Sequence, residues 1–129
     1  MDELMYLNLL SNNAELFEKE FRSLNEFYDL NNEKEIHKFI KSNPGLIILL
    51  NAYENSLKKY FSSAIFELKF KPDLSGTWFD LISLIVWLDE ETFNNGSIDH
   101  IYAIDRELRP LRKKLDLLGE ICLTKRILR

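Results

Sequence analysis

Residues 43–71, NPGLIILLNAYENSLKKYFSSAIFELKFK, decide the fold, because a helical pattern there runs directly into a strand pattern. Asn43 can cap a helix with its side-chain oxygen, and Pro44 suits the first helical position, where a missing amide costs no hydrogen bond. Apolar residues then form one broad stripe at helical spacing; they are Leu46, Leu49, Leu50, Tyr53, Leu57, Tyr60 and Phe61. This stripe predicts an amphipathic helix over residues 44–61.

After this helix the apolar period changes to strict alternation. In IFELKFK, residues 65–71, Phe66, Leu68 and Phe70 alternate with charged side chains, which is the two-residue repeat of a strand with one buried face. Pro72 then ends the pattern. Residues 65–71 are therefore predicted to form a strand that follows the helix directly.

The same two periods predict three more helices and two more strands. Helical spacing of apolar residues marks residues 13–30, 33–41 and 98–118. The apolar run over residues 78–88 is typical of a strand covered on much of both faces, and residues 120–128 alternate as a closing strand. The last helical rhythm passes through Pro110, so either one kinked helix or two pieces that share a face would fit.

Together these elements predict an α+β fold, in which a small, mainly antiparallel sheet of about three strands is covered by helices. The chain has 129 residues, of which 46% are hydrophobic, and a chain of this size can bury roughly two-thirds of its unfolded surface. We therefore expect residues 1–129 to form a single globular domain. With so few strands, the edges of the sheet need cover from helices or from a partner chain.

The composition favours a cytoplasmic protein. The single cysteine, Cys122, cannot form an internal disulfide, and the first ten residues, MDELMYLNLL, carry acid where a secretory signal would carry base. The longest apolar runs fall far short of the roughly 20 residues that a membrane span needs. No membrane segment is therefore expected.

The charge distribution provides one candidate binding surface. The net charge is −4, yet residues 106–129 are rich in arginine and lysine. On the predicted helix 98–118, the basic residues opposite the leucine row or at its border are Arg106, Arg109, Arg112 and Lys113. This face could contact the phosphates of a nucleic acid, form a protein interface, or simply be solvated. Asp105 and Asp116 weaken its field, because each can pair with an arginine four residues away.

A second candidate surface lies on the predicted helix 13–30. Its aromatic stripe repeats at four, three and four residues and consists of Phe17, Phe21, Leu24 and Tyr28. A helix this rich in aromatic residues needs burial, either beneath its own domain or against a second copy of the chain. The stripe is therefore a candidate dimer surface.

No arrangement of side chains in the sequence predicts catalysis. The two histidines stand on predicted helices, without a nucleophile or a carboxylate pair at catalytic or ligand spacing. A metal-dependent hydrolase would have to use Glu67, Asp73 and Asp80. The segments ELK and PD around the first two contain the pieces of a PD-(D/E)xK nuclease site, but in reversed order. No cofactor or metal is therefore expected.

The central portion of the chain resembles a family of small, uncharacterised prokaryotic proteins. That family combines the helix pattern FL..NP.L...L.EAY..I..YF with A.L.LEV..DPE, an apolar strand, an acidic helix and a closing G.LCI.LEF. The matching pieces here are FIKSNPGLIILLNAYENSLKKYF, AIFELKFKPD, LISLIVWL and GEICLTKRIL. The chain departs from the pattern at RELRPLRKKL, where the family tends to have an acidic segment with paired tryptophans. The resemblance implies an intracellular α+β domain and brings no established activity.

The sequence therefore favours a non-enzymatic cytoplasmic interaction domain. Its partner would be another protein or a second copy of the chain, bound through the aromatic helix or a sheet edge. One alternative is a nucleic-acid-associated protein that uses the basic face of Arg106, Arg109, Arg112 and Lys113. The other alternative is the metal-dependent hydrolase.

Overall fold

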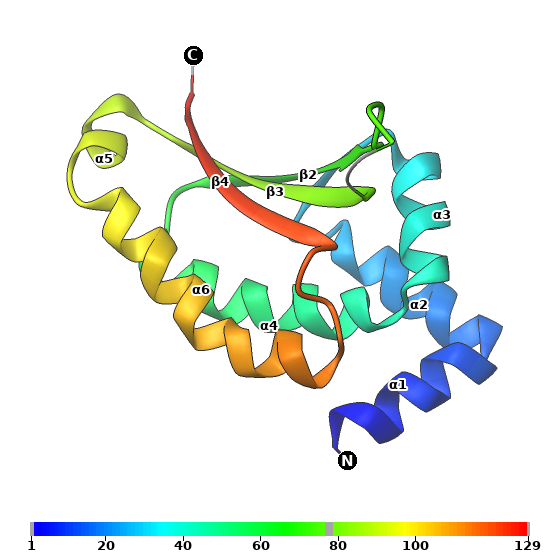
Figure 1. Ribbon diagram of the computed structural model, residues 1–129. Coiled ribbons are helices and arrows are strands. Elements are labelled where there is room, and N and C mark those ends of the chain that lie inside the picture. The colour runs from blue at the N-terminus through cyan, green and yellow to red at the C-terminus, as the bar shows by residue number, and fades with distance from the viewer. Residues whose placement is uncertain (1, 77–78, 129) are drawn as a thin grey trace.

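A computed structural model gives the structure of residues 2–76 and 79–128. The architecture is α+β, with a four-stranded sheet lying over a layer of helices (Figure 1). Within the described residues the helices are α1 (Glu3–Asn12), α2 (Ala14–Leu24), α3 (Glu33–Ser42), α4 (Gly45–Tyr60), α5 (Glu90–Asn94) and α6 (Ser97–Lys114). The strands are β1 (Asp29–Asn31), β2 (Ile65–Lys71), β3 (Leu81–Leu88) and β4 (Ile121–Ile127).

The sheet is mixed and follows the chain order β1-β2-β3-β4. Only the central pair β2–β3 is antiparallel, whereas β1–β2 and β3–β4 are parallel. The expectation of a mainly antiparallel, three-stranded sheet is therefore wrong in detail, although the α+β class is confirmed. The physical reason is the connection: α3 and α4 lie between β1 and β2, and α5 and α6 lie between β3 and β4. Such helical crossovers return the chain in the same direction.

Most predicted segments are confirmed within one to three residues at each end. The helix expected over residues 44–61 is α4, and the strand expected over residues 65–71 is β2. The strand expected over residues 78–88 begins at Leu81, with residues 77 and 78 outside the described residues. Helix α6 is one continuous α-helix that contains Pro110, and it ends at Lys114 instead of residue 118.

The helix expected over residues 13–30 ends earlier, at Leu24. The amides of Asn25, Glu26 and Phe27 each bond to a carbonyl three residues back, which tightens the helix end into a turn. The chain then extends, and residues 29–31 pair with Glu67, Leu68 and Lys69 of β2. Tyr28 is buried like the helical positions before it. Because its spacing continues the apolar stripe, the sequence predicted helix where the structure has a turn and a short strand.

The predicted cap of α4 is also wrong. The Asn43 side chain donates its Nδ2 hydrogen to the carbonyl of Phe39 at 3.0 Å, and its amide bonds to Ile40 O at 2.9 Å. Asn43 therefore closes α3, and α4 begins at Gly45 without a side-chain cap. The first turn of α4 is held instead by burial, because Leu46 and Ile47 are both completely inaccessible.

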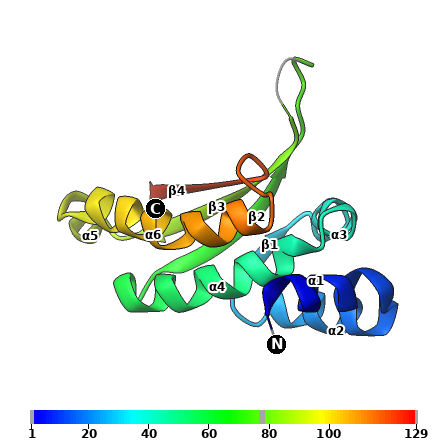
Figure 2. The ribbon, with the colours of Figure 1, turned by 60° about the horizontal axis from the view of Figure 1, so that its bottom comes forward.

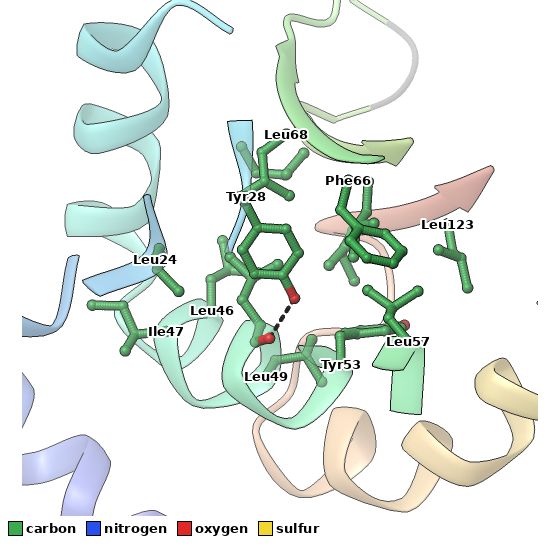
Figure 3. Close-up of a cluster of buried hydrophobic side chains, with 14 of the residues drawn as sticks. Leu24, Tyr28, Leu46, Ile47, Leu49, Tyr53, Leu57, Phe66, Leu68 and Leu123 are labelled. Atoms are coloured by element: carbon green, nitrogen blue, oxygen red, sulfur yellow. Dashed lines mark hydrogen bonds between the residues drawn. The ribbon is translucent and has the colours of Figure 1, made fainter. Parts of the chain in front are cut away.

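The hydrophobic core lies between α4 and the sheet (Figure 3). Leu50, Tyr53 and Leu57 of α4 are fully buried, as the stripe predicted. Tyr28 adds the one buried polar contact drawn in the figure, in which its hydroxyl donates to the carbonyl of Leu50 at 2.5 Å. Burial raises the pKa of the Tyr28 hydroxyl well above its ordinary value, so this hydroxyl remains a donor.

Polar contacts join α6 to its neighbours. The carboxylate of Glu107 accepts hydrogen bonds from Tyr60 at 2.7 Å and Ser56 at 3.0 Å, both on α4. At the other end of α6, Arg112 donates to the carbonyls of Leu117, Leu118 and Ile121. These contacts fix the helix against α4 and fix the loop that leads into β4.

Among the described helices, none is long and apolar enough to cross a membrane.

Candidate interaction surface

The sheet has one face covered by helices and one open face. Side chains alternate between the two faces along each strand, and Phe66, Leu84 and Leu123 belong to the core on the helix side. Figures 1 and 2 show helices beneath that side or beyond the ends of the strands, and no helix over the other. The residues of β2, β3 and β4 on the open face are Ile65, Glu67, Lys69, Lys71, Leu81, Ser83, Ile85, Trp87, Cys122, Thr124 and Arg126.

Glu67 organises the side chains of the open face. Its Oε1 accepts a hydrogen bond from Nε1 of Trp87 at 3.0 Å, and its Oε2 accepts one from Nδ2 of Asn31 at 3.0 Å. These two bonds link β1, β2 and β3 across the face. Asp29 lies beside Glu67 in the parallel register, so one end of the face is acidic.

A hollow of about 820 Å³ lies around the carboxyl end of β4. It is lined by Asp29, Ile65, Glu67, Trp87, Phe93, Lys125, Arg126, Ile127 and Leu128. The lining combines aromatic and aliphatic surface with carboxylates on the β1–β2 side and a guanidinium on β4. Such a lining can bind apolar and charged side chains of another protein. The described residues of this lining include no hydroxyl, thiol or histidine side chain.

Strands β1 and β4 are the two edge strands of the sheet, and β4 is the longer of them. The amide of Ile82 bonds to Glu120 O at 2.8 Å, and the amide of Leu128 bonds to Leu88 O at 2.7 Å. The even-numbered residues of β4 therefore bond to β3, and the odd-numbered ones turn their amides and carbonyls outward. Arg112 occupies the outward carbonyl of Ile121. Within the described residues, no hydrogen bond uses the outward groups of Leu123, Lys125 or Ile127.

Lysines on edge strands often discourage pairing with other chains. The Lys125 side chain does not have this effect here, because it points away from the backbone edge. Its ammonium donates to the Ser97 hydroxyl at 2.7 Å and to the Phe93 carbonyl at 3.3 Å. It also lies 4.1 Å from the centre of the Phe93 ring, within cation–π range. The charge is therefore held on the helix side of the strand, and the backbone edge stays accessible.

Exposed apolar residues of α6 accompany the open edge. Glu107 and His100 contact α4, whereas helical spacing places Ile98, Tyr102 and Arg109 on the opposite flank. Ile98 is 42% exposed and Tyr102 57% exposed. Asp105, on the same flank, interacts electrostatically with Arg109 and Arg112, while burial raises the pKa of its carboxyl. The flank thus combines apolar surface with both signs of charge.

The predicted basic face is only partly available. Arg106, Arg109 and Lys113 are exposed. Arg112 is half-buried and bonded to carbonyls of the α6–β4 loop, at 3.2 Å to Leu117 O and 3.1 Å to Ile121 O. The sequence contained a signal for this structural role. Arg112 stands at the border of the leucine row, just before the helix end and a loop that contains glycine.

The four residues expected as a candidate dimer surface lie in the core of their own chain. Phe17, Phe21, Leu24 and Tyr28 are each at most 4% exposed. His37 of α3 packs edge-on against Phe17 and Phe21, and its Nε2 lies 2.7 Å from Oε1 of Glu18. The stripe is thus buried beneath its own domain, the first of the two alternatives, and is not accessible to a second copy.

The carboxylates of the hydrolase alternative have other contacts. Asp80 accepts a hydrogen bond from the amide of Asp73 at 2.7 Å, and Asp73 accepts bonds from the amides of Ser75 and Gly76. These bonds shape the loop after β2, while Glu67 lies on the open face. In the part of the chain that the structure describes, no three His, Cys, Asp or Glu side chains form a group that could hold a metal ion.

The chain was compared with protein-family models, with curated proteins and with solved structures, and no match was found in any of the three comparisons. The candidate surface therefore rests on its own geometry. The open edge of β4, the flank of α6 beside it and the open face of the sheet are its three parts.

Proposed function

We propose that this chain is a non-enzymatic, cytoplasmic protein-interaction domain that binds its partner along β4. The observation that carries the proposal is the set of outward amides and carbonyls of Leu123, Lys125 and Ile127 on β4, which no hydrogen bond uses within the described residues. An extended segment of another protein can add a strand to such an edge, with main-chain hydrogen bonds giving affinity and side-chain pockets giving specificity. The hollow beside Trp87 and Arg126 would receive side chains of the added strand.

The proposal is tested by removing one outward amide. Proline at position 127 removes the amide of Ile127, which faces outward, and leaves the β3–β4 ladder intact; prolines are tolerated on edge strands for this reason. Ile127→Ala is the matched control, because it shortens the same side chain and keeps the amide. A partner captured from cytoplasmic extract is identified, purified and titrated against wild type, I127P and I127A.

We expect I127P to bind about tenfold more weakly than I127A, because both variants lose the same side chain and only I127P also loses a main-chain hydrogen bond. Equal affinity of all three proteins for the purified partner would contradict binding at this edge. Far-UV circular dichroism and urea unfolding check that I127P keeps the fold.

Nucleic-acid binding is a second candidate, favoured by three exposed cations. Arg106, Arg109 and Lys113 make no ion pair in the part of the chain that the structure covers. The test is fluorescence anisotropy with labelled single-stranded and duplex oligonucleotides, using the variant R106E/R109E/K113E. Arg112 is left unchanged, because it holds the loop before β4. Affinity that falls with salt and is lost in the variant would support this function; affinity that stays the same in the variant would exclude it.

A further inference from the structure

We infer that the partner of this edge is a second copy of the chain. Two copies would pair β4 with β4 in antiparallel orientation, about a two-fold axis at Thr124, and so join two sheets into one. This inference rests on the proposed function, because it uses the same edge and names the protein that occupies it. A two-fold interface requires that the same patch be complementary to itself, and β4 can be examined for that property residue by residue.

The hydrogen-bonding pattern of β4 is self-complementary in this register. With Thr124 on the axis, Leu123 lies opposite the partner's Lys125, and Ile121 lies opposite the partner's Ile127. All four positions are odd-numbered, and their amides and carbonyls point outward. Each outward amide therefore meets an outward carbonyl, as in the hydrogen-bonded pairs of an antiparallel ladder. The Ile121 carbonyl already accepts a hydrogen bond from Arg112, and its second lone pair would accept from the Ile127 amide of the other copy. The whole strand from Ile121 to Ile127 is paired, and no strand residue is left over.

The side chains fit the same register. Arg126 lies opposite the partner's Cys122, and Lys125 lies opposite the partner's Leu123, so no like charges meet directly. Thr124 lies opposite its own copy, and threonine pairs are among the favourable cross-strand pairs. The Thr124 hydroxyl is buried and has no hydrogen-bond partner among the described residues. The second threonine would bring a hydroxyl to that position.

Neighbouring registers pair fewer strand residues or set like charges opposite each other. Centring the axis on Lys125 would place two lysines directly opposite each other, which is unfavourable, and would leave residues 121 and 122 unpaired. Centring it on Leu123 would leave residues 126 and 127 unpaired. An axis between two residues would pair odd positions with even ones, so outward groups would face groups that already bond to β3. Among these registers, the axis at Thr124 is therefore the one that pairs the whole strand and sets no like charges opposite each other.

Helix α6 would add side-chain contacts to this dimer. Ser97 lies beside Lys125, and Arg112 lies beside Ile121, so α6 runs along β4 in the opposite direction. The two-fold axis would bring the exposed flanks of both helices toward each other. Ile98 and Tyr102 would then lose exposed apolar surface. Asp105 of one copy and Arg109 of the other carry opposite charges, which suits a contact between the same flanks of two copies.

Disulfide cross-linking under mild oxidation tests the register. Residues directly opposite each other at a non-hydrogen-bonded pair have Cα atoms about 4.5 Å apart, within the range that a disulfide spans. We expect T124C in a C122S background to form a dimer that is stable without reductant, because position 124 faces itself. We expect R126C to cross-link through the native Cys122 of the other copy.

Two proteins serve as negative controls. Wild type should not cross-link through Cys122, although this thiol is exposed, because position 122 faces position 126. R126C in a C122S background should not cross-link either, because the partner thiol is then missing. A dimer in which T124C/C122S does not cross-link, or in which wild type cross-links as readily as R126C, would overturn the proposed pairing.

Molar mass in solution completes the test. Sedimentation equilibrium of the wild-type chain at about 100 μM should show a dimer, since this concentration reveals dissociation constants in the micromolar range. I127P should raise the dimer dissociation constant about a hundredfold relative to I127A, because the two-fold axis makes the change remove two amides, one from each copy. A monomeric wild-type protein would overturn the inference about the second copy. It would leave the proposed function to be decided separately by the purified partner, so the two failures are distinguishable.

Discussion

The two faces of the sheet are built by different interactions, although the same strands carry both. On the covered face, Phe66, Leu84 and Val86 pack against helices and are nearly or completely inaccessible. On the open face, Glu67 holds Trp87 and Asn31 by hydrogen bonds, and no helix lies above them. The covered face therefore holds most of the buried packing, whereas the hydrogen bonds of the open face lie within the sheet itself. Substitutions on the two faces should consequently differ in size and in kind.

The largest effect is expected on the covered face. Leu84→Ala removes a fully buried side chain from the core, and such changes cost about 2–5 kcal/mol of unfolding free energy. Ile85→Ala is the matched change on the open face. Ile85 is only 4% exposed but lies outside the core cluster, among the side chains of its own sheet. We expect it to cost about half as much, since less packing is lost. Urea unfolding measures both, and equal losses would remove the distinction between the faces.

A smaller effect is expected from the buried hydroxyls on the helix side. Tyr28 and Tyr53 are both fully buried. The Tyr28 hydroxyl bonds to Leu50 O, whereas the Tyr53 hydroxyl has no hydrogen bond of sound geometry within the described residues. Burial raises the pKa of Tyr53 to about 12, and the nearby Arg112 opposes this shift.

We expect Y28F to lose about 1 kcal/mol of unfolding free energy, the net value of one hydrogen bond. Y53F should be nearly neutral or stabilising, because it removes a hydroxyl whose burial is uncompensated. Thermal or urea unfolding of the two single variants decides the point. A larger loss for Y53F than for Y28F would show that Tyr53 has a polar partner in solution, with Arg112 the nearest candidate.

A still smaller effect is expected at Glu67 on the open face. Glu67→Ala removes both acceptors of the network and should cost about 0.5–1 kcal/mol, because the bonds are partly exposed to water. Glu67→Gln keeps one acceptor for the indole of Trp87 and should cost less. Near-ultraviolet circular dichroism reports the packing of Trp87, and urea unfolding reports the free energy. A loss as large as that of L84A would mean that the open face is part of the core.

The smallest effect depends on pH and lies between α4 and α6. Hydrogen bonds from Tyr60 and then Ser56 hold the pKa of the Glu107 carboxyl below its ordinary value of 4.5. The ionised carboxylate therefore stabilises the folded state above the unfolded pKa, and this contribution is lost as the pH falls through the folded pKa. The urea midpoints of wild type and E107Q should differ at neutral pH and converge in acid. A difference between wild type and E107Q that stays constant from neutral to acid pH would contradict the assignment.

The segment 43–71 could be predicted because it is long and periodic. The stripe of α4 and the alternation of β2 each repeat over several residues, and both periods were confirmed. The direction of strand pairing was predicted as mainly antiparallel and was wrong for two of the three pairs, since periodicity shows which residues face the core but not the path between strands. Strand β1 has three residues, too few to show any alternation.

The candidate surface was harder to predict than the fold. The open edge of β4 depends on which strand is outermost, and that order is a property of the whole sheet. Only the general expectation that a small sheet leaves an edge in need of cover came from the sequence. Arg112 is a second example. Its charge could be read from the sequence, but its hydrogen bonds to the carbonyls of Leu117 and Ile121 depend on the path of the loop between α6 and β4.

The strands occupy the sheet in the order in which they follow one another along the chain, and this order shapes the route to the native state. The short connection over residues 72–80 allows β2 and β3 to meet first, because short loops are closed at small entropic cost. The outer strands can then be added one at a time, each to a neighbour already in place. No strand has to insert between two others, but β1 and β4 reach their parallel neighbours only through helical crossovers. Such non-local pairing is slow, so the two outer strands should form after the β2–β3 pair and should limit the rate of refolding.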